Sequence, residues 1–326
     1  MRVIAAFSPG FDKVVAKALA RELGAPPLKL SVHDGLARFD SSASFRRIAG
    51  APCLASVWAV FREFEGQPSF AKMIRENVAL RLPKGFQARD FRLRFMRAGK
   101  LTPVEPQLLT QAERAISRAT GLKSGRTGAD CEFWYVVRSE GGGFFGLLLS
   151  DPSERKPEKG ELRPSLAAAI AELGGVTDGD VVLDPFAGHG SLAAAAHSLA
   201  KVKIISVERD RELAGFLKHR FARTDGSRVI EGDARALPLD DRSVSLVLTD
   251  PPWGEFRRDD SLDDLYRDAL SEMARVLRDD GRAVVLTARE FGLWEIASDC
   301  GFNEKSRVDT LVGGKKATAH LLTKRR

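Results

Sequence analysis

The sequence is poor in cysteine and has no long apolar run. Its 326 residues include three cysteines, Cys53, Cys131 and Cys300, which lie far apart and form no C-x-x-C pair. This spacing indicates neither a disulfide framework nor a zinc site, so we expect no metal. No stretch approaches the roughly 18 uninterrupted apolar residues of a membrane span, and the first residues lack the apolar region of a signal peptide. We therefore expect a cytoplasmic protein without a membrane partner.

Excess basic charge is confined to the first half of the chain. Residues 1–160 hold 26 Lys and Arg against 16 Asp and Glu, a net charge of +10, whereas residues 161–326 hold 25 against 28, a net charge of −3. The chain is also long enough for two domains that each bury a core. A basic half joined to a near-neutral half predicts that the first half holds a polyanion on which the second half acts.

The second half is organised around the stretch VVLDPFAGHGSL at residues 181–192. An apolar strand ends in Asp184, passes through a turn with Gly188 and Gly190, and opens into an alanine-rich helix over residues 191–200. Glycines let a ligand approach closely, and a helix start offers unpaired N–H groups, which suits a nucleotide-like ligand. Ala193 and its neighbours replace the third glycine of the dinucleotide fingerprint, which disfavours NAD.

Three further strand-like runs end in a carboxylate. These runs cover residues 204–207, 229–230 and 245–249, and they lead into Glu208, Asp233 and the tetrapeptide Asp250, Pro251, Pro252 and Trp253. In an open parallel sheet the carboxyl ends of the strands meet at the edge that binds ligands. Singly, each carboxylate is equally consistent with a solvated strand end, but the spaced set predicts a ligand site.

The motifs DPFAGHGS, ERD, EGDA and DPPW together resemble the class I S-adenosylmethionine-dependent methyltransferases, in the branch that methylates exocyclic or amide nitrogens. The resemblance covers roughly residues 160–326 and implies a Rossmann-like seven-stranded α/β sheet closed by an antiparallel hairpin over residues 308–322. It implies that the cofactor S-adenosylmethionine contacts Ser165, Asp184, Phe186, Gly188, Gly190, Glu208, Arg209, Asp233 and Ala234. His189 departs from the family's usual Ser or Thr. It is either a tolerated loop substitution, or it narrows the cofactor pocket or contributes a donor there.

The same resemblance implies roles by position. Asp184 would bind the methionine amino group, Glu208 the ribose hydroxyls and Asp233 the adenine amine. The lone pair of a purine exocyclic amine is delocalised, so Asp250 and the Pro251 carbonyl would accept its two hydrogens and tilt that lone pair toward the methyl group. Pro251 and Pro252 stiffen this edge. Trp253 would stack on a base that is flipped out of its helix.

The first half alternates strand and helix patterns. We expect strands at residues 2–7, 28–32, 36–39 and 55–64, with helices at 11–24 and 44–49, which is the β-α-β-β-α-β order of a ferredoxin-like fold. Further along, helices are expected at 69–82 and 105–121, and strands at 91–97, 131–137 and 143–149. The strand at 91–97 alternates apolar and basic residues, so Arg92, Arg94 and neighbouring Arg97 are expected to face solvent.

The stretches FRLRFMRAGK, TQAERAISRATGLK, CEFWYVV and GFFGLLLS resemble a THUMP domain over roughly residues 70–150. That family grips tRNA, so tRNA, through its acceptor region, is the polyanion that the resemblance implies. The candidate RNA-binding residues are Arg92, Arg94, Arg97, Lys100, Lys123 and Arg126, although a solvated basic face would look the same.

Four segments are expected. These are a ferredoxin-like domain at 1–68, a THUMP-like domain at 69–150, a polar linker at 151–162 and a class I methyltransferase domain at 163–326. Within the last, residues 255–264 are expected to form a loop, 265–277 a helix, 282–287 a strand and 294–297 a helical turn.

We therefore predict a monomeric, metal-independent tRNA methyltransferase that acts on a purine exocyclic amine, most of all guanine N2. A DNA adenine or cytosine amino-methyltransferase is the alternative, although no separate target-recognition region is visible. A protein-glutamine methyltransferase would leave the basic half without a purpose. A catalytically inactive RNA-binding module is the alternative from another class, for which His189 is the one hint. The tRNA position and the number of methyl groups stay open.

Overall fold

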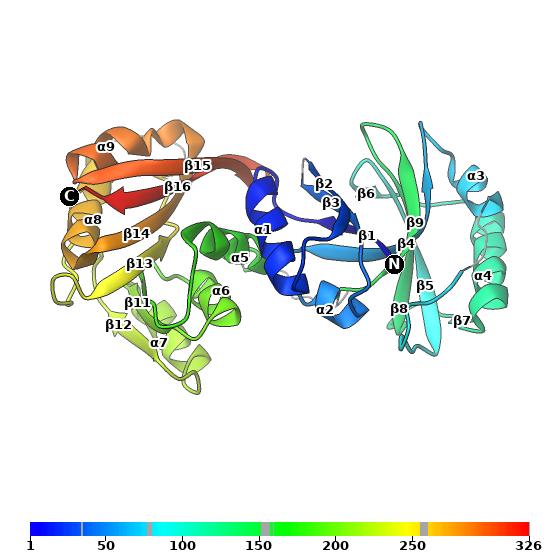
Figure 1. Cartoon of the computed structure of the whole chain (residues 1–326), viewed down its shortest axis with the longest axis horizontal. Helices are drawn as coiled ribbons and strands as arrows, with labels where there is room; N and C mark the ends of the chain where they lie inside the picture. The colour runs from blue at the N-terminus through cyan, green and yellow to red at the C-terminus, as the bar shows by residue number, and fades with distance from the viewer. Residues whose placement is uncertain (34, 77–79, 151–156, 159, 255–259, 326) are drawn as a thin grey trace. The chain divides into compact units, whose positions relative to one another are not determined.

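The computed structural model describes residues 1–33, 35–76, 80–150, 157–158, 160–254 and 260–325. They fall into two compact units (Figure 1). Residues 1–6 and 16–155 make up the first unit, and residues 7–15 and 156–326 the second. Each unit is built on its own sheet.

The start of the first unit has the predicted ferredoxin-like order. Its elements are β1 (Arg2–Ala6), α1 (Asp12–Leu23), β2 (Leu28–His33), β3 (Leu36–Asp40), α2 (Phe45–Ala49) and β4 (Ser56–Phe64). The four strands lie in the order β2-β3-β1-β4, with every neighbouring pair antiparallel. The second part of the unit contains α3 (Phe70–Arg75), β5 (Asp90–Arg97), β6 (Lys100–Leu101), α4 (Pro106–Thr120), β7 (Lys123–Ser124), β8 (Cys131–Val137) and β9 (Gly143–Leu148).

Both parts of the first unit share one sheet. Strand β9 pairs antiparallel with β4 and with β8, while β5 runs parallel to β8, so the described strands form a nine-stranded sheet. Figure 1 shows α3 and α4 side by side against strands of this sheet, over a core rich in phenylalanine. Within that core the ring centroids of Tyr135 and Phe145 lie 4.3 Å apart. The predicted subdivision at residue 68 stays a prediction.

The helix predicted over residues 69–82 was too long, because α3 ends at Arg75 and residues 80–82 are not helical. Arg62 of β4 explains this end. Its guanidinium donates to the backbone carbonyl of Glu76 and, at 2.8 Å, to the Glu76 carboxylate. The carbonyl of this C-cap residue is therefore held by a side chain from the sheet.

The second unit contains the predicted seven-stranded sheet. Its elements are α5 (Pro164–Gly174), β10 (Val181–Asp184), α6 (Ser191–Leu199), β11 (Lys203–Glu208), α7 (Arg211–Arg220), β12 (Ser227–Glu231), β13 (Val244–Thr249), α8 (Asp260–Val276), β14 (Leu277–Ala288), the 3-10 helix η2 (Arg289–Phe291), α9 (Leu293–Asp299), β15 (Phe302–Val312) and β16 (Lys315–Lys324). Its strand order is β12-β11-β10-β13-β14-β16-β15. The closing hairpin is confirmed, since β16 pairs antiparallel with both β14 and β15.

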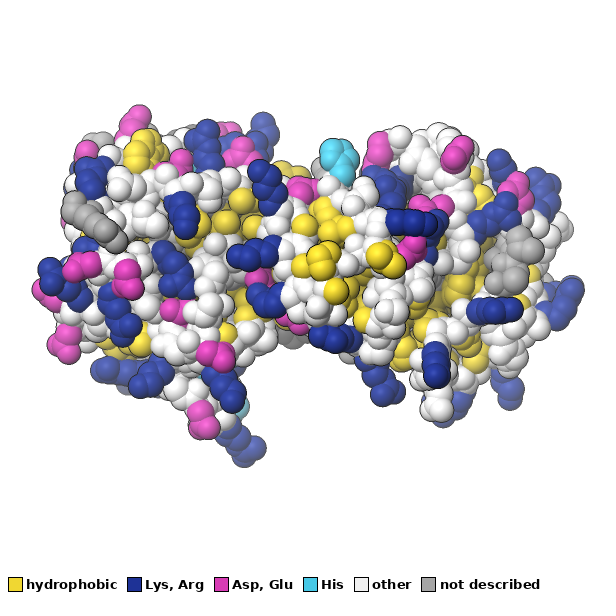
Figure 2. Space-filling model, in the orientation of Figure 1, with side chains coloured by type: hydrophobic (Ala, Val, Ile, Leu, Met, Phe, Trp, Pro, Cys, Tyr) yellow, Lys and Arg dark blue, Asp and Glu magenta, His cyan; other side chains and the backbone are white. Residues whose placement is uncertain are grey.

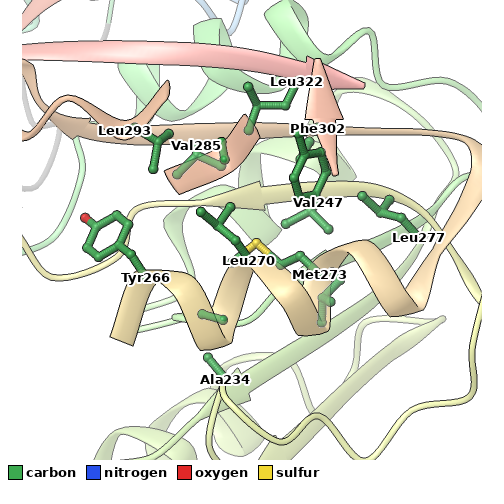
Figure 3. Packing of buried hydrophobic residues seen from close by; sticks show 14 of the residues in the cluster. Ala234, Val247, Tyr266, Leu270, Met273, Leu277, Val285, Leu293, Phe302 and Leu322 are labelled. Atoms are coloured by element: carbon green, nitrogen blue, oxygen red, sulfur yellow. The ribbon is translucent and has the colours of Figure 1, made fainter. Parts of the chain in front are cut away.

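Alternation along the strands places helices on both faces of this sheet. Figure 3 shows Leu270 and Met273 of α8 packed in one cluster with Val247 and Val285. The neighbouring strand residues point the other way. A Cβ at Gly174 of α5 would lie 3.1–3.2 Å from Leu246, Leu248 and Val284, so the end of α5 packs closely on the opposite face.

Helix α8 begins earlier than the sequence predicts. The loop predicted over 255–264 was wrong for residues 260–264, because α8 begins at Asp260. Leu262, Tyr266 and Ala269 recur at helical spacing and are buried, which explains the earlier start. Residues 255–259 lie outside the described part of the chain. Within the described ranges, no helix is both long and apolar enough for a membrane span.

Candidate active site

Parallel pairing brings the predicted carboxylates to one edge of the second sheet. Strand β10 lies between β11 and β13, and its register pairs Asp184 with Ser206 and Leu183 with Val247. Glu208 and Asp250 follow their strands within a few residues of these positions. The carboxyl ends of the three strands therefore meet where open α/β sheets bind ligands.

Asp184 is buried without a basic partner. Its side chain is 2% exposed, and its Oδ1 accepts a hydrogen bond of 3.2 Å from the Phe186 amide. The pKa of Asp184 is raised to about 8, mainly by burial, and the charges of Asp250 and Glu208 contribute to this rise. No Lys, Arg or His among the described residues pairs with this carboxylate. A buried acid of this kind is suited to a cationic ligand.

Asp250 is half-buried at the same edge of the sheet. Burial raises its pKa to about 7, and the Trp253 indole opposes this by donating to Oδ1 at 2.9 Å. The Tyr266 hydroxyl donates to the Pro252 carbonyl at 3.1 Å, so this hydrogen bond ties the DPPW segment to α8. Burial also raises the pKa of Tyr266 and keeps its hydroxyl protonated. The Asp250 carboxylate is thus oriented by its own motif.

The two glycines of the turn, Gly188 and Gly190, are required for different structural reasons. Gly188 has φ +50, and no heavy atom lies within 4 Å of the place where a Cβ would stand, so this side of the loop is open. Its amide donates to Glu208 Oε2 at 2.8 Å. Gly190 has φ +80, and a Cβ there would lie 2.7 Å from both Leu217 and Phe221. Gly188 therefore leaves room for a ligand, and Gly190 lets α7 pack against the loop.

Asp233, the predicted adenine ligand, already has a partner. Arg235 donates to both of its carboxylate oxygens, with the shortest distance at 2.7 Å. That ion pair lowers the pKa of Asp233 to about 2, and the charge of Arg209 acts in the same direction. The carboxylate keeps free lone pairs, so its role toward adenine stays a prediction.

The remaining cofactor candidates differ in burial. Ser165 is buried in the first turn of α5, and Ala234 is buried after β12. Phe186 is half-buried against the core of the unit, whereas Arg209 is exposed. Sequence reasoning missed Tyr266, which is one of only two tyrosines and lies on the apolar stripe of a helix, where it looks like an ordinary core residue.

The strand arginines of the first unit are not free, which corrects the expectation that Arg92 and Arg94 face solvent. Glu132 on the neighbouring strand is 3% exposed and accepts hydrogen bonds from the guanidinium groups of both residues. The Trp134 indole donates to its other oxygen at 2.8 Å. The residues opposite each other in register are Arg92 with Glu132 and Arg94 with Trp134. A long-range pair therefore neutralises part of the predicted basic face.

The other four candidate RNA-binding residues form no ion pair with an acidic residue within the described ranges. Lys100, Lys123 and Arg126 are exposed, and Arg97 lies over the Phe70 ring at 5.0 Å. On α4, a hollow of about 480 Å³ is lined by Pro106, Gln107, Thr110, Gln111, Arg114 and Arg118. Sequence reasoning missed Arg114 and Arg118, although their i,i+4 spacing on an amphipathic helix was a usable signal. Figure 2 shows basic side chains over both units on the face in view.

Comparison with known proteins identifies both the second half and the whole fold. Residues 153–317 match the family model described as an RMKL-like methyltransferase domain. A tRNA (guanine(6)-N2)-methyltransferase of Thermus thermophilus is 30% identical over 225 residues, which cover 66% of this chain and 67% of that protein. A tRNA (guanine(10)-N2)-dimethyltransferase of Methanothermobacter thermautotrophicus is 35% identical over 37% of each chain. The crystal structure of TrmN from Thermus thermophilus superposes with a TM-score of 0.79, at 23% identity over 99% of both chains.

Proposed function

Because the chain belongs to the family of RMKL-like methyltransferase domains, we propose that it transfers a methyl group from S-adenosylmethionine to guanine N2 in tRNA. The observation that carries this proposal is the half-buried Asp250 carboxylate, which Trp253 orients at the ligand-binding edge of the sheet. The named activities of the two curated relatives support the choice of substrate.

The residues present fit S-adenosylmethionine. The cofactor supplies an electrophilic methyl group on a sulfonium centre. Asp184 offers a buried carboxylate to its amino group, and Gly188 leaves the space that close approach requires. Glu208 stands at the end of β11, where it can accept hydrogen bonds from ribose hydroxyls. Ser165, Phe186, Arg209, Asp233 and Ala234 complete the proposed cofactor contacts, with Gly190 shaping the turn.

At the acceptor side, Asp250 prepares the substrate amine. Trp253 occupies Oδ1, which leaves Oδ2 to accept one N–H of the exocyclic amine. The Pro251 carbonyl would accept the second N–H, and the two prolines limit movement of the segment. This arrangement orients the nitrogen lone pair, so catalysis rests mainly on positioning and proton acceptance. The half-buried Trp253 ring provides a surface against which a flipped base can stack.

The first unit would hold the RNA through its unpaired cations. We assign Arg97, Lys100, Lys123 and Arg126 to this surface, and we add Arg114 and Arg118 of α4. Arg92 and Arg94 would contribute only the part of their charge that Glu132 leaves uncompensated. Replacing Arg118 with alanine should weaken tRNA binding and lower its salt slope by about one, whereas Lys17→Ala on exposed α1 should not. We place the enzyme in the cytoplasm as a monomer.

Methyl incorporation distinguishes the substrates. Purified protein is incubated with labelled S-adenosylmethionine and either bulk tRNA or duplex DNA, and the nucleosides are identified by mass spectrometry. We expect label in tRNA as N2-methylated guanosine, and no label in DNA. Label in adenine or cytosine of the duplex would identify a DNA amino-methyltransferase instead. No transfer to either nucleic acid, with cofactor binding intact, would favour an inactive RNA-binding module.

A further inference from the structure

Helix α7 holds the glycine turn from outside the cofactor site. The carbonyl of His189, between the two glycines, accepts a hydrogen bond from Arg220 Nη1 near the end of α7. The His189 ring meets Phe216 of the same helix edge to face, with ring centroids 5.8 Å apart. Gly190 fits against Leu217, which directly follows Phe216 and lies about one helical turn before Arg220. One face of α7 therefore contacts two consecutive residues of the turn.

Arg220 is itself held by the buried carboxylate of Glu161. Glu161, from the segment before α5, has a side chain that is only 5% exposed, and its Oε1 lies 3.4 Å from the same Arg220 Nη1. The guanidinium also lies over the Phe221 ring, 5.6 Å from its centroid. An arginine fixed by a carboxylate and an aromatic ring loses little further freedom when it binds a carbonyl. Its orientation is set before any ligand arrives.

We propose that Arg220, held by Glu161, is a positioning residue that sets the glycine turn for the cofactor through the His189 carbonyl. The inference rests on the proposed function, because the turn is assigned to S-adenosylmethionine. It gives His189 a role as an anchor on α7, through its carbonyl and ring, and removes the need for a contact between its side chain and the cofactor. The open side of Gly188 is then held in a fixed place beside Glu208.

The test is calorimetric titration of S-adenosylmethionine into the full-length protein, combined with steady-state kinetics. Arg220→Ala should raise the Kd and the KM for the cofactor about tenfold, which corresponds to one lost charge-assisted hydrogen bond, and leave kcat nearly unchanged. Arg220→Lys should recover part of the affinity, since an ammonium retains a donor. The matched control is Lys218→Ala, an exposed cation of the same helix, which should bind like the wild type.

Cofactor binding by the wild type tests the proposed function, and cofactor binding by the Arg220 variant tests the positioning role. If the wild type does not bind S-adenosylmethionine, the proposed function fails. If the wild type binds and Arg220→Ala binds equally well, only the positioning role is overturned. Should Arg220→Ala not fold, Glu161→Gln provides the second variant. It keeps the shape of the side chain and should raise the Kd severalfold, and an unchanged Kd in that variant would also reject the role.

Discussion

Two buried strand carboxylates, Glu132 of β8 in the first unit and Asp184 of β10 in the second, have opposite surroundings. Glu132 of the first unit is 3% exposed and is satisfied by two arginines and an indole. Asp184 of the second unit is equally buried, and no basic side chain of the described residues pairs with it. A paired buried charge can be maintained by the fold alone, whereas an unpaired one keeps its charged form at a cost. The difference marks the second carboxylate as a ligand site.

The largest expected effect comes from removing Asp250, the carboxylate that is proposed to orient the substrate amine. Asp250→Ala should lower kcat for methyl transfer by about a thousandfold or more, because the amine loses the acceptor that orients it. Binding of tRNA and of S-adenosylmethionine should persist. Single-turnover rates with saturating ligands measure this, and a variant with wild-type activity would refute the catalytic role.

Removing the paired acid should affect stability and leave the cofactor site intact. Glu132→Ala leaves Arg92 and Arg94 adjacent on a half-buried surface, so we expect the free energy of unfolding to fall by about 3–5 kcal/mol. The Kd for S-adenosylmethionine should not change. Urea titration measures the first quantity and calorimetry the second. A large loss of cofactor affinity without a loss of stability would break the distinction between the two kinds of carboxylate.

Asp184→Asn should stabilise the protein without ligand, by an amount that grows as pH rises from about 4 to about 8. The folded pKa of about 8 lies above the unfolded value of about 3.9, so ionisation costs stability as pH rises between them. The asparagine cannot ionise. We expect a gain of a few kcal/mol at pH 8, with about 5 kcal/mol as the upper bound, and little gain at pH 4. A loss of stability at pH 8 would show that the carboxylate has a partner in solution.

The smallest effect concerns the indole that orients Asp250. Trp253→Phe keeps a ring for stacking and removes the N–H that holds Oδ1 at 2.9 Å. We expect kcat to fall about tenfold, since one hydrogen bond to a charged group is lost. Because this bond lowers the pKa of Asp250, the acidic limb of the pH–rate profile should also move to higher pH. An unmoved profile would mean that the bond is not made during turnover.

The sequence allowed the local parts of the site to be predicted and left the long-range pairs unseen. Asp184, Glu208, Asp233 and Asp250 were predictable because parallel strands of similar length end at one edge. The pairing of Arg92 with Glu132 was not, since it depends on the register of β5 against β8, 40 residues apart in the chain. Alternation correctly assigned a face to those arginines and could not show what shares that face.

The ends of two helices were predicted wrongly for a related reason. The periodicity over residues 69–82 continued past the point where Arg62, from a distant strand, takes the carbonyl of Glu76. In the same way, α8 starts at Asp260 because its apolar stripe meets the sheet core, which no local signal in an acidic segment revealed. The hydrogen bond between Arg220 of α7 and the His189 carbonyl likewise joins residues 31 positions apart.

Asp184 is expected to form an ion pair with the amino group of the cofactor. Measuring the protons released when S-adenosylmethionine binds tests this expectation most directly. S-adenosylmethionine is titrated into the protein at pH 7 in two buffers with different ionisation enthalpies. Because the pKa of Asp184 lies at about 8 before binding, pairing with the amino group should release close to one proton at pH 7. Asp184→Asn should release none at this pH. Tight cofactor binding by the wild type with no proton released at pH 7 would contradict the account.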